Sequence, residues 1–167
     1  VDAGSDVLVT VMKEWARLAF VDVETTGLSP IEDRIAEIGV VTLDDDGSVE
    51  RWTTLLSTSS RGDRSGALGS SPYGTRGAPS FPDIAADLAR RLEGRLFVAH
   101  NARFDYAFLR AEFERATIAF QPEVVCSVML SRLLHPGFAH HDMDSLVARH
   151  GFRVEERHCN PMGICHG

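Results

Sequence analysis

An apolar segment that begins at Leu18 ends in an Asp-x-Glu pair, Asp22 and Glu24, and Thr25-Thr26-Gly27 follows at once. The segment predicts a short β-strand, and because strand side chains alternate, residues two apart point to the same face. Two carboxylates at the end of a hydrophobic strand are costly unless a positive charge lies between them. A hard divalent cation, which prefers oxygen ligands, is the natural occupant. The pair therefore predicts a metal site at the end of this strand.

The rest of the chain alternates between strand and helix patterns after an opening meander. An Asp44–Gly47 hairpin signal joins two apolar runs, and Ser80 with Asp83 forms a capping-box pattern at a helix start. This order predicts an α/β fold, in which a mixed sheet (an antiparallel meander plus parallel strands) is flanked by helices. The expected strands are 18–24, 35–43, 49–56, 96–99 and 124–126, and the expected helices begin at 80 and cover 105–116, 127–134 and 143–150.

Composition narrows the class of protein. The chain has 167 residues, enough for one domain with a good core, and no apolar run long enough for a membrane span. Three cysteines form no paired framework, which indicates a reducing cytoplasm. The net charge is −7, so any nucleic acid must be attracted locally, for example by bound metal ions. All basic residues except Lys13 are arginines, and they are scattered.

Two segments carry little pattern. Residues 1–16 predict a leading helix or a loosely packed arm. Residues 57–77 are rich in Ser, Gly and Arg, and they predict an atypical flexible loop, unusual in a compact domain. Three arginines there, Arg61, Arg64 and Arg76, suggest backbone binding to nucleic acid, against the plainer interpretation of a solvated loop.

A second motif, His100-Asn101-Ala102-Arg103-Phe104-Asp105, supplies a third acid, and several histidines follow near the end of the chain. Two-metal hydrolysis needs this set of residues, because carboxylates hold two ions about 3.5–4 Å apart. An imidazole can take a proton from the attacking water, since its ordinary pKa is about 6.5. Metal-dependent cleavage of a phosphodiester is the predicted chemistry.

These motifs, together with Arg34-Ile-Ala-Glu37-Ile-Gly39, resemble the signature motifs of the DnaQ-like 3′–5′ exonucleases. The subtype is the one with four acids and a histidine (DEDDh), typified by the proofreading epsilon subunit of bacterial DNA polymerase III. The match runs through 17–56 and 78–157. The resemblance implies a ribonuclease-H-like fold, two Mg²⁺ or Mn²⁺ ions, and release of nucleoside monophosphates from a single-stranded 3′ end.

The resemblance also implies roles for particular residues. Asp22, Glu24 and Asp105 would be metal ligands, and Glu37 a supporting residue. His158 would be the general base. The terminal nucleotide would lie against the remaining motif residues, Thr25, Thr26, Gly27, Leu28, His100, Asn101 and Phe104.

The third motif departs from the family pattern. An aspartate is expected five residues after the histidine, but position 163 is Gly163 and no acid follows His158. We therefore expect a single exonuclease domain over 1–167, truncated at its C-terminal helix. The segment 57–77 also departs from the family pattern. A reading-frame slip or a truncation would produce both departures.

The residues leave alternatives open. Asp22 and Glu24 could be solvent-facing charges, Asp105 a helix-start acid, and His100 and Asn101 structural. His140, His141, His150 and His166 compete with His158, whereas Asp142 and Asp144 fit helix caps. A zinc site is the further alternative, with His158, Cys159, Cys165 and His166 as ligands.

Two functions follow from this pattern. The first is a 3′–5′ exonuclease on single-stranded DNA, favoured over RNA, with a DNA polymerase or a fused domain as an implied partner. The alternative is a weakened or inactive relative that binds nucleic acid or a protein partner, because the final motif acid is missing. Proofreading, repair and RNA turnover all stay open.

Overall fold

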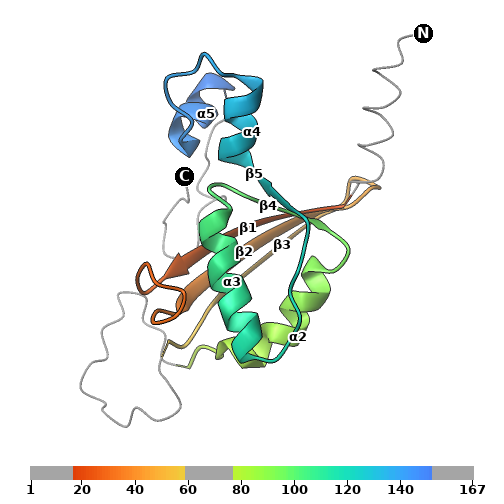
Figure 1. Cartoon of the computed structure of the whole chain (residues 1–167). Helices are drawn as coiled ribbons and strands as arrows, with labels where there is room; N and C mark the ends of the chain where they lie inside the picture. Colours follow the sequence, from red (N-terminus) through yellow and green to blue (C-terminus); the bar gives the residue numbers. More distant parts are fainter. Residues whose placement is uncertain (1–16, 59–76, 152–167) are drawn as a thin grey trace.

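The computed structural model describes residues 17–58 and 77–151. Five strands and four helices occur in this part of the chain (Figure 1). The strands are β1 (Leu18–Thr25), β2 (Ile35–Leu43), β3 (Val49–Leu55), β4 (Leu96–Ala99) and β5 (Val124–Cys126), and the helices are α2 (Phe81–Leu92), α3 (Arg103–Arg115), α4 (Ser127–Leu134) and α5 (Met143–Arg149).

All five strands belong to one mixed sheet in the order β3-β2-β1-β4-β5. The pairs β1–β2 and β2–β3 are antiparallel, whereas β1–β4 and β4–β5 are parallel. The β2–β3 connection is the predicted hairpin, in which Gly47 has φ +82° and donates its N–H to Asp44 O at 2.9 Å. The predicted α/β architecture, with an antiparallel meander plus parallel strands and flanking helices, is confirmed.

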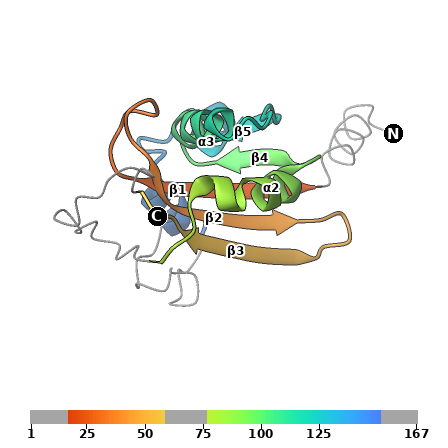
Figure 2. The same ribbon diagram turned by 90° about the horizontal axis from the view of Figure 1, so that it is seen from below.

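The core lies between one face of this sheet and helices α2 and α3, which both cover that face (Figures 1 and 2). Alternate residues of β1 point into it: Ala19, Val21 and Val23 are each at most 6% exposed. Burial of this strand face and the matching helix stripes supplies most of the stabilisation. The helix residues that are fully or almost fully buried there are Phe81, Ala85, Leu88, Leu92, Phe108, Leu109 and Phe113.

Local signals explain the helix ends. The Asp83 carboxylate accepts the Ser80 N–H at 2.8 Å, so the expected capping box starts α2. Asp142 caps α5, because its Oδ1 accepts the Ser145 N–H at 2.9 Å. The predicted cap at this position is confirmed. Helix α3 starts at Arg103, two residues before the expected start.

Some expectations concern residues outside the described part of the chain: the leading helix or arm at 1–16, most of the loop 57–77, and everything after Gly151. Across 17–58 and 77–151, no helix has the length and apolar character to cross a membrane.

Candidate active site

Asp22 and Glu24 occupy the C-terminal half of β1, the central strand of the sheet. Their side chains alternate with the buried Val21 and Val23, so they share the opposite face, as predicted. Glu24 pairs with Glu37 across the β1–β2 ladder. Glu37 is 3% exposed, and its Oε1 accepts a hydrogen bond from Thr53 Oγ1 at 3.3 Å. Like charges directly opposite each other in a ladder are destabilising, which favours a compensating positive charge nearby.

Asp105 reaches this pair from the first turn of α3. Strand β4 pairs with β1 only as far as Phe20, so the edge of β1 continues beyond its neighbour. Here Asp105 Oδ1 accepts the backbone N–H of Val23 at 3.2 Å. Val23 lies between the two acids in sequence, so the hydrogen bond brings a third carboxylate to the Asp-x-Glu pair.

Asp105 is also the most perturbed carboxyl group of this site. Burial, together with the charges of Asp22 and Glu24, raises the pKa of Asp105 to about 7, against two opposing backbone hydrogen bonds. Asp105 is only 3% exposed. The three acids therefore interact as one negative cluster, and a functional role is favoured over a helix-start acid.

This donor set is chemically suited to a hard divalent cation. All three groups offer carboxylate oxygens, and a cation would offset the negative charge that raises the pKa of Asp105. Within the residues that the structure describes, no group of three or more Asp, Glu, His or Cys side chains is arranged so that it could hold a metal ion. The cluster fits a cation by charge and donor type.

The β1–β2 loop folds closely on itself beside the acids. Thr26 N–H donates to Arg34 O at 2.9 Å, and Arg34 N–H donates to Thr26 Oγ1 at 3.0 Å. Thr25 Oγ1 donates to Gly27 O at 2.6 Å. Leu28 is 86% exposed at the tip. The threonines predicted to contact substrate therefore also shape the loop, while Leu28 is presented outward.

Two arginines attach this loop to α3. Arg34 Nε lies 2.9 Å from Glu112 Oε1, and Arg115 Nη1 lies 3.3 Å from the same oxygen. Arg115 Nη2 also donates to Pro30 O at 2.6 Å and to Ile31 O at 2.8 Å. Glu112 is 2% exposed. The loop and the helix that carries Asp105 are thus held together by a buried acid, which the sequence interpretation missed.

The His100–Phe104 motif forms the turn between β4 and α3. His100 Nδ1 lies 2.9 Å from Ser127 Oγ, and Asn101 adopts a left-handed conformation with φ 60°. A positive φ is rare outside glycine and is frequent at functional turns. Burial lowers the pKa of His100, while the carboxylates of Asp142 and Asp22 oppose this shift. Phe104 is half-buried, with its ring centroid 4.9 Å from that of Phe108.

The expected general base His158, the glycine at 163 and the alternative zinc ligands lie outside the described residues. Among the competing histidines, His141 Nδ1 lies 2.8 Å from Ser131 Oγ on α4, and His150 and His135 have ring centroids 5.9 Å apart. His140 is exposed.

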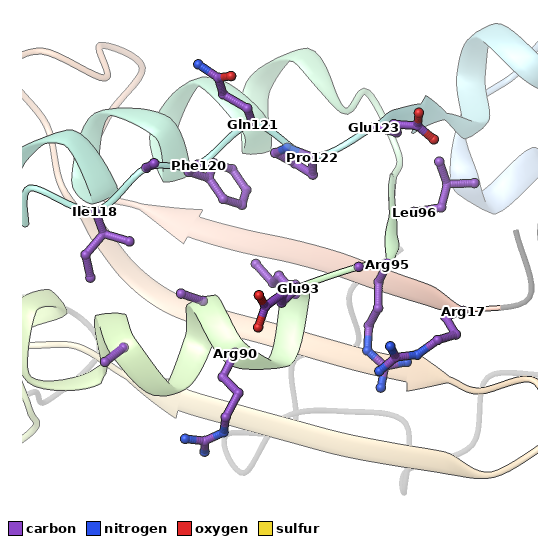
Figure 3. Close-up of a pocket in the computed structure, with 15 residues that line it drawn as sticks. Arg17, Arg90, Glu93, Arg95, Leu96, Ile118, Phe120, Gln121, Pro122 and Glu123 are labelled. Carbon is purple, nitrogen blue, oxygen red and sulfur yellow. The ribbon is translucent and has the colours of Figure 1, made fainter.

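Among the hollows formed by the described residues, two lie at opposite ends of the parallel strands. The larger, about 850 Å³, lies where β1 and β4 begin and is lined by Arg17, Arg95 and Phe120, far from the acids along the strands (Figure 3). Its arginines Arg17 and Arg95 both pair with Asp44. The smaller, about 490 Å³, lies at the C-terminal ends of β4 and β5 and includes His100. Ligands of open α/β sheets bind at this carboxyl end.

Comparisons with known proteins agree with this architecture. The RNase_T family model, described as exonuclease, matches residues 19–161. The chain is 35% identical over 144 residues to the DNA polymerase III subunit epsilon of Treponema pallidum, covering 82% of this chain and 66% of that protein. It is 30% identical over 146 residues to the 3′-5′ exonuclease DinG of Bacillus subtilis, covering 85% of this chain and 16% of that protein. The chain thus spans just under two thirds of the first relative and about a sixth of the second.

A solved structure shares the fold. The product-bound structure of exonuclease I superposes with a TM-score of 0.67 at 19% sequence identity, over 86% of this chain and 40% of that one. The mixed sheet and its helices therefore have the fold of exonuclease I, which confirms the predicted ribonuclease-H-like fold.

Proposed function

The chain belongs to the RNase_T exonuclease family, and from this premise we propose that it is a metal-dependent 3′–5′ exonuclease that releases nucleoside monophosphates from single-stranded DNA. The observation that carries the proposal is the hydrogen bond from Val23 N–H to Asp105 Oδ1, which brings a third carboxylate to the Asp22–Glu24 pair. The raised pKa of Asp105 supports it, because part of the rise comes from the other two acids.

Asp22, Glu24 and Asp105 would hold two Mg²⁺ or Mn²⁺ ions. Such ions supply Lewis acidity toward the scissile phosphate and lower the pKa of water. The acids place negative charge at one end of the sheet. Without bound ions, this charge would repel an acidic substrate. The protein would thus attract the phosphate through bound ions in place of a broad basic surface, consistent with its net charge of −7.

Other residues would orient the strand end. Leu28, exposed on the anchored loop, and the half-buried Phe104 would offer apolar surface for the terminal base and sugar. We assign removal of the proton from the attacking water to His158. The water oxygen then bonds to phosphorus and the bond from phosphorus to the 3′ oxygen of the preceding nucleotide breaks. That oxygen takes up a proton from solvent, and the terminal nucleoside 5′-monophosphate leaves.

The first test is hydrolysis of a 5′-labelled oligonucleotide by the full chain with Mg²⁺ or Mn²⁺, against EDTA. DNA and RNA are run side by side. We expect single-nucleotide shortening from the 3′ end that Asp22→Ala abolishes. Asp45→Ala is the matched control, because Asp45 is an exposed acid in the β2–β3 turn. Equal activity in the Asp22→Ala variant would overturn the proposal.

One observation favours a second function, a weakened relative that binds without efficient cleavage. Gly163 occupies the position at which the family motif places its fourth acid. Loss of a residue that supports a metal site typically lowers affinity or activity by about 10–100-fold. Under this alternative, the wild type binds single strands but cleaves them poorly.

A further inference from the structure

The smaller hollow beside the acids is built differently from the acid cluster. Its walls come from the turn after β4, the start of α3, the end of β5, helix α4 and the residue before α5. The polar side chains that line it include His100, Arg103, Arg132, His141 and Asp142. Four of these five groups are basic residues, in a chain of net charge −7.

Helix α4 fixes both imidazoles of this hollow. Ser127 and Ser131 are one helical turn apart, so their hydroxyls lie on one side of the helix. Ser127 Oγ lies 2.9 Å from His100 Nδ1, and Ser131 Oγ lies 2.8 Å from His141 Nδ1. When each hydroxyl donates to Nδ1, the ring proton is on Nε2, which becomes a donor for a further acceptor. The same helix thus orients both rings, each through one serine hydroxyl.

The arginines of the hollow are not neutralised by the described part of the protein. Most other arginines of 17–58 and 77–151 form ion pairs, whereas Arg103 and Arg132 form none with any acid in those ranges. The acid of the hollow, Asp142, uses its oxygens to accept from Ser145 N–H and Oγ–H at 2.9 and 2.8 Å. A guanidinium without an acidic partner in a concave site is suited to a phosphate.

We propose that this hollow binds the sugar–phosphate backbone of the substrate strand on the 5′ side of the scissile bond. Arg103 and Arg132 pair with its phosphates, and His100 and His141 donate from Nε2. The inference rests on the proposed function, since it gives the strand a path away from the acids. The position supports this path, because His100 lines the hollow and also lies close enough to Asp22 to interact with its charge.

The test measures binding without cleavage. Fluorescence anisotropy follows 5′-labelled oligothymidylates of two and four nucleotides with the full chain in EDTA, over a series of salt concentrations. The Arg103→Gln/Arg132→Gln variant should bind the tetranucleotide at least about tenfold more weakly than the wild type does. The slope of log K against log salt should decrease by about 0.7 for each lost phosphate contact. Most of the affinity that the wild type gains from the two additional nucleotides should disappear.

Two further variants make the result specific. Arg110→Gln is the matched control, because Arg110 is an exposed arginine of α3 that does not line the hollow. Arg103→Lys/Arg132→Lys keeps the charge and should recover most of the salt slope. If the glutamine variant binds the tetranucleotide like the control, or loses affinity equally for both lengths, the proposal is overturned.

Failure of this inference can be told apart from failure of the exonuclease proposal. A wild type that binds the tetranucleotide but shows no metal-dependent cleavage removes the proposed activity and leaves the binding comparison intact. An active wild type whose salt slope is unaltered by Arg103→Gln/Arg132→Gln removes the strand-binding hollow and leaves the activity intact.

Discussion

Asp105 Oδ1 accepts the backbone N–H of Val23 at 3.2 Å, so the first turn of α3 is bonded to the central strand between its two acids. This bond holds a buried carboxyl group next to Asp22 and Glu24, whose charges contribute to its raised pKa. The fold therefore keeps these groups together against their mutual repulsion. In the absence of a cation, this repulsion should lower the free energy of unfolding.

The metal-free protein should become less stable as the pH rises from about 4 to about 7. The pKa of Asp105 is about 7 in the fold and 3.8 in the reference state. Between these values the folded chain keeps a proton that the unfolded chain has lost, so the free energy of unfolding decreases with pH. The whole effect is on the order of 4 kcal/mol at most, from 1.36 kcal/mol per pKa unit. Urea denaturation in EDTA at a series of pH values measures it.

Asp105→Asn is the control for this pH effect, because an amide oxygen can still accept the Val23 N–H but cannot ionise. The variant should lose the decline between pH 4 and pH 7 and be more stable than the wild type at pH 8 in EDTA. It should also be inactive. An unchanged pH profile in this variant would contradict the assignment of the decline to Asp105.

Divalent ions should stabilise the protein and release protons when they bind. At a pH near 6.5, a fraction of Asp105 is protonated, and a bound cation would displace that proton. Isothermal titration with Mn²⁺ in two buffers of different ionisation enthalpy measures the number of protons released. Asp22→Asn should weaken binding by at least about tenfold. Binding with no proton release at pH 6.5 would count against a cation at Asp105.

Gly27→Ala should disturb the β1–β2 loop. A Cβ at this position would lie 2.5 Å from Asp33 Cγ and 2.6 Å from Asp33 Oδ1. Asp33 cannot move freely, because its Oδ2 accepts the Ser29 N–H at 2.9 Å. We expect a loss of about 1–3 kcal/mol in the free energy of unfolding, typical of overpacking, and a lower kcat/KM.

Two comparisons isolate the Gly27 effect. Gly137→Ala should be nearly neutral, because nothing lies within 4 Å of its Cβ position. Adding Asp33→Ala to Gly27→Ala should return part of the lost stability. If the double variant is less stable than the sum of the single effects, the collision with Asp33 is not the cause.

Removing the ion-pair partners of the buried Glu112 should lower the free energy of unfolding. Its Oε1 contacts Arg34 and Arg115, and its Oε2 has no hydrogen-bond partner within the described residues. Removing both arginines (Arg34→Gln/Arg115→Gln) leaves a charge 2% exposed without its partners, which typically costs about 3–5 kcal/mol. Glu112→Gln should cost less, since both arginines reach solvent.

Chemical denaturation gives these free energies, and oligonucleotide KM values report the anchoring of the loop. The double arginine variant should raise KM, because Arg115 no longer holds Pro30 O and Ile31 O. Arg110→Gln, on the exposed side of α3, should leave both quantities near wild type. Equal losses for Glu112→Gln and the double arginine variant would contradict the buried-charge explanation.

Gly163→Asp separates the two proposed functions. If the wild type is a weakened relative, supplying the acid that the family motif has at this position should raise metal-dependent cleavage by about 10–100-fold. If the wild type is already an efficient exonuclease, the change should be small. Steady-state cleavage of labelled single-stranded DNA with Mn²⁺ decides between them, and Gly163→Asn controls for side-chain size without charge.

Most of the fold was predictable because its signals are local. An apolar segment marks β1, the capping box marks the start of α2, and Gly47 marks the β2–β3 turn. The approach of Asp105 to Asp22 and Glu24 came from family resemblance, since no local rule says that α3 follows a strand beside β1. The parallel β1–β4 pairing that creates this proximity depends on contacts far apart in sequence.

Other parts of the site could not be predicted from the sequence for the same reason. Glu112 lies four residues after Phe108, on the apolar stripe of α3, so its burial had a helical signal. Its partner Arg34, however, comes from a distant loop. The serine–histidine pairs of α4 also join segments whose proximity is set only by how β4 and β5 place the turns that follow them.

The Val23–Asp105 bond also bears on how the protein matures. It joins residues 82 positions apart, and closing so long a loop is entropically unfavourable until other contacts support it. We therefore expect the acids to come together late in folding, once the strands that support this contact have docked. If the proposed function holds, a newly made or partly denatured chain would lack nuclease activity until this contact forms, even where its secondary structure is already present.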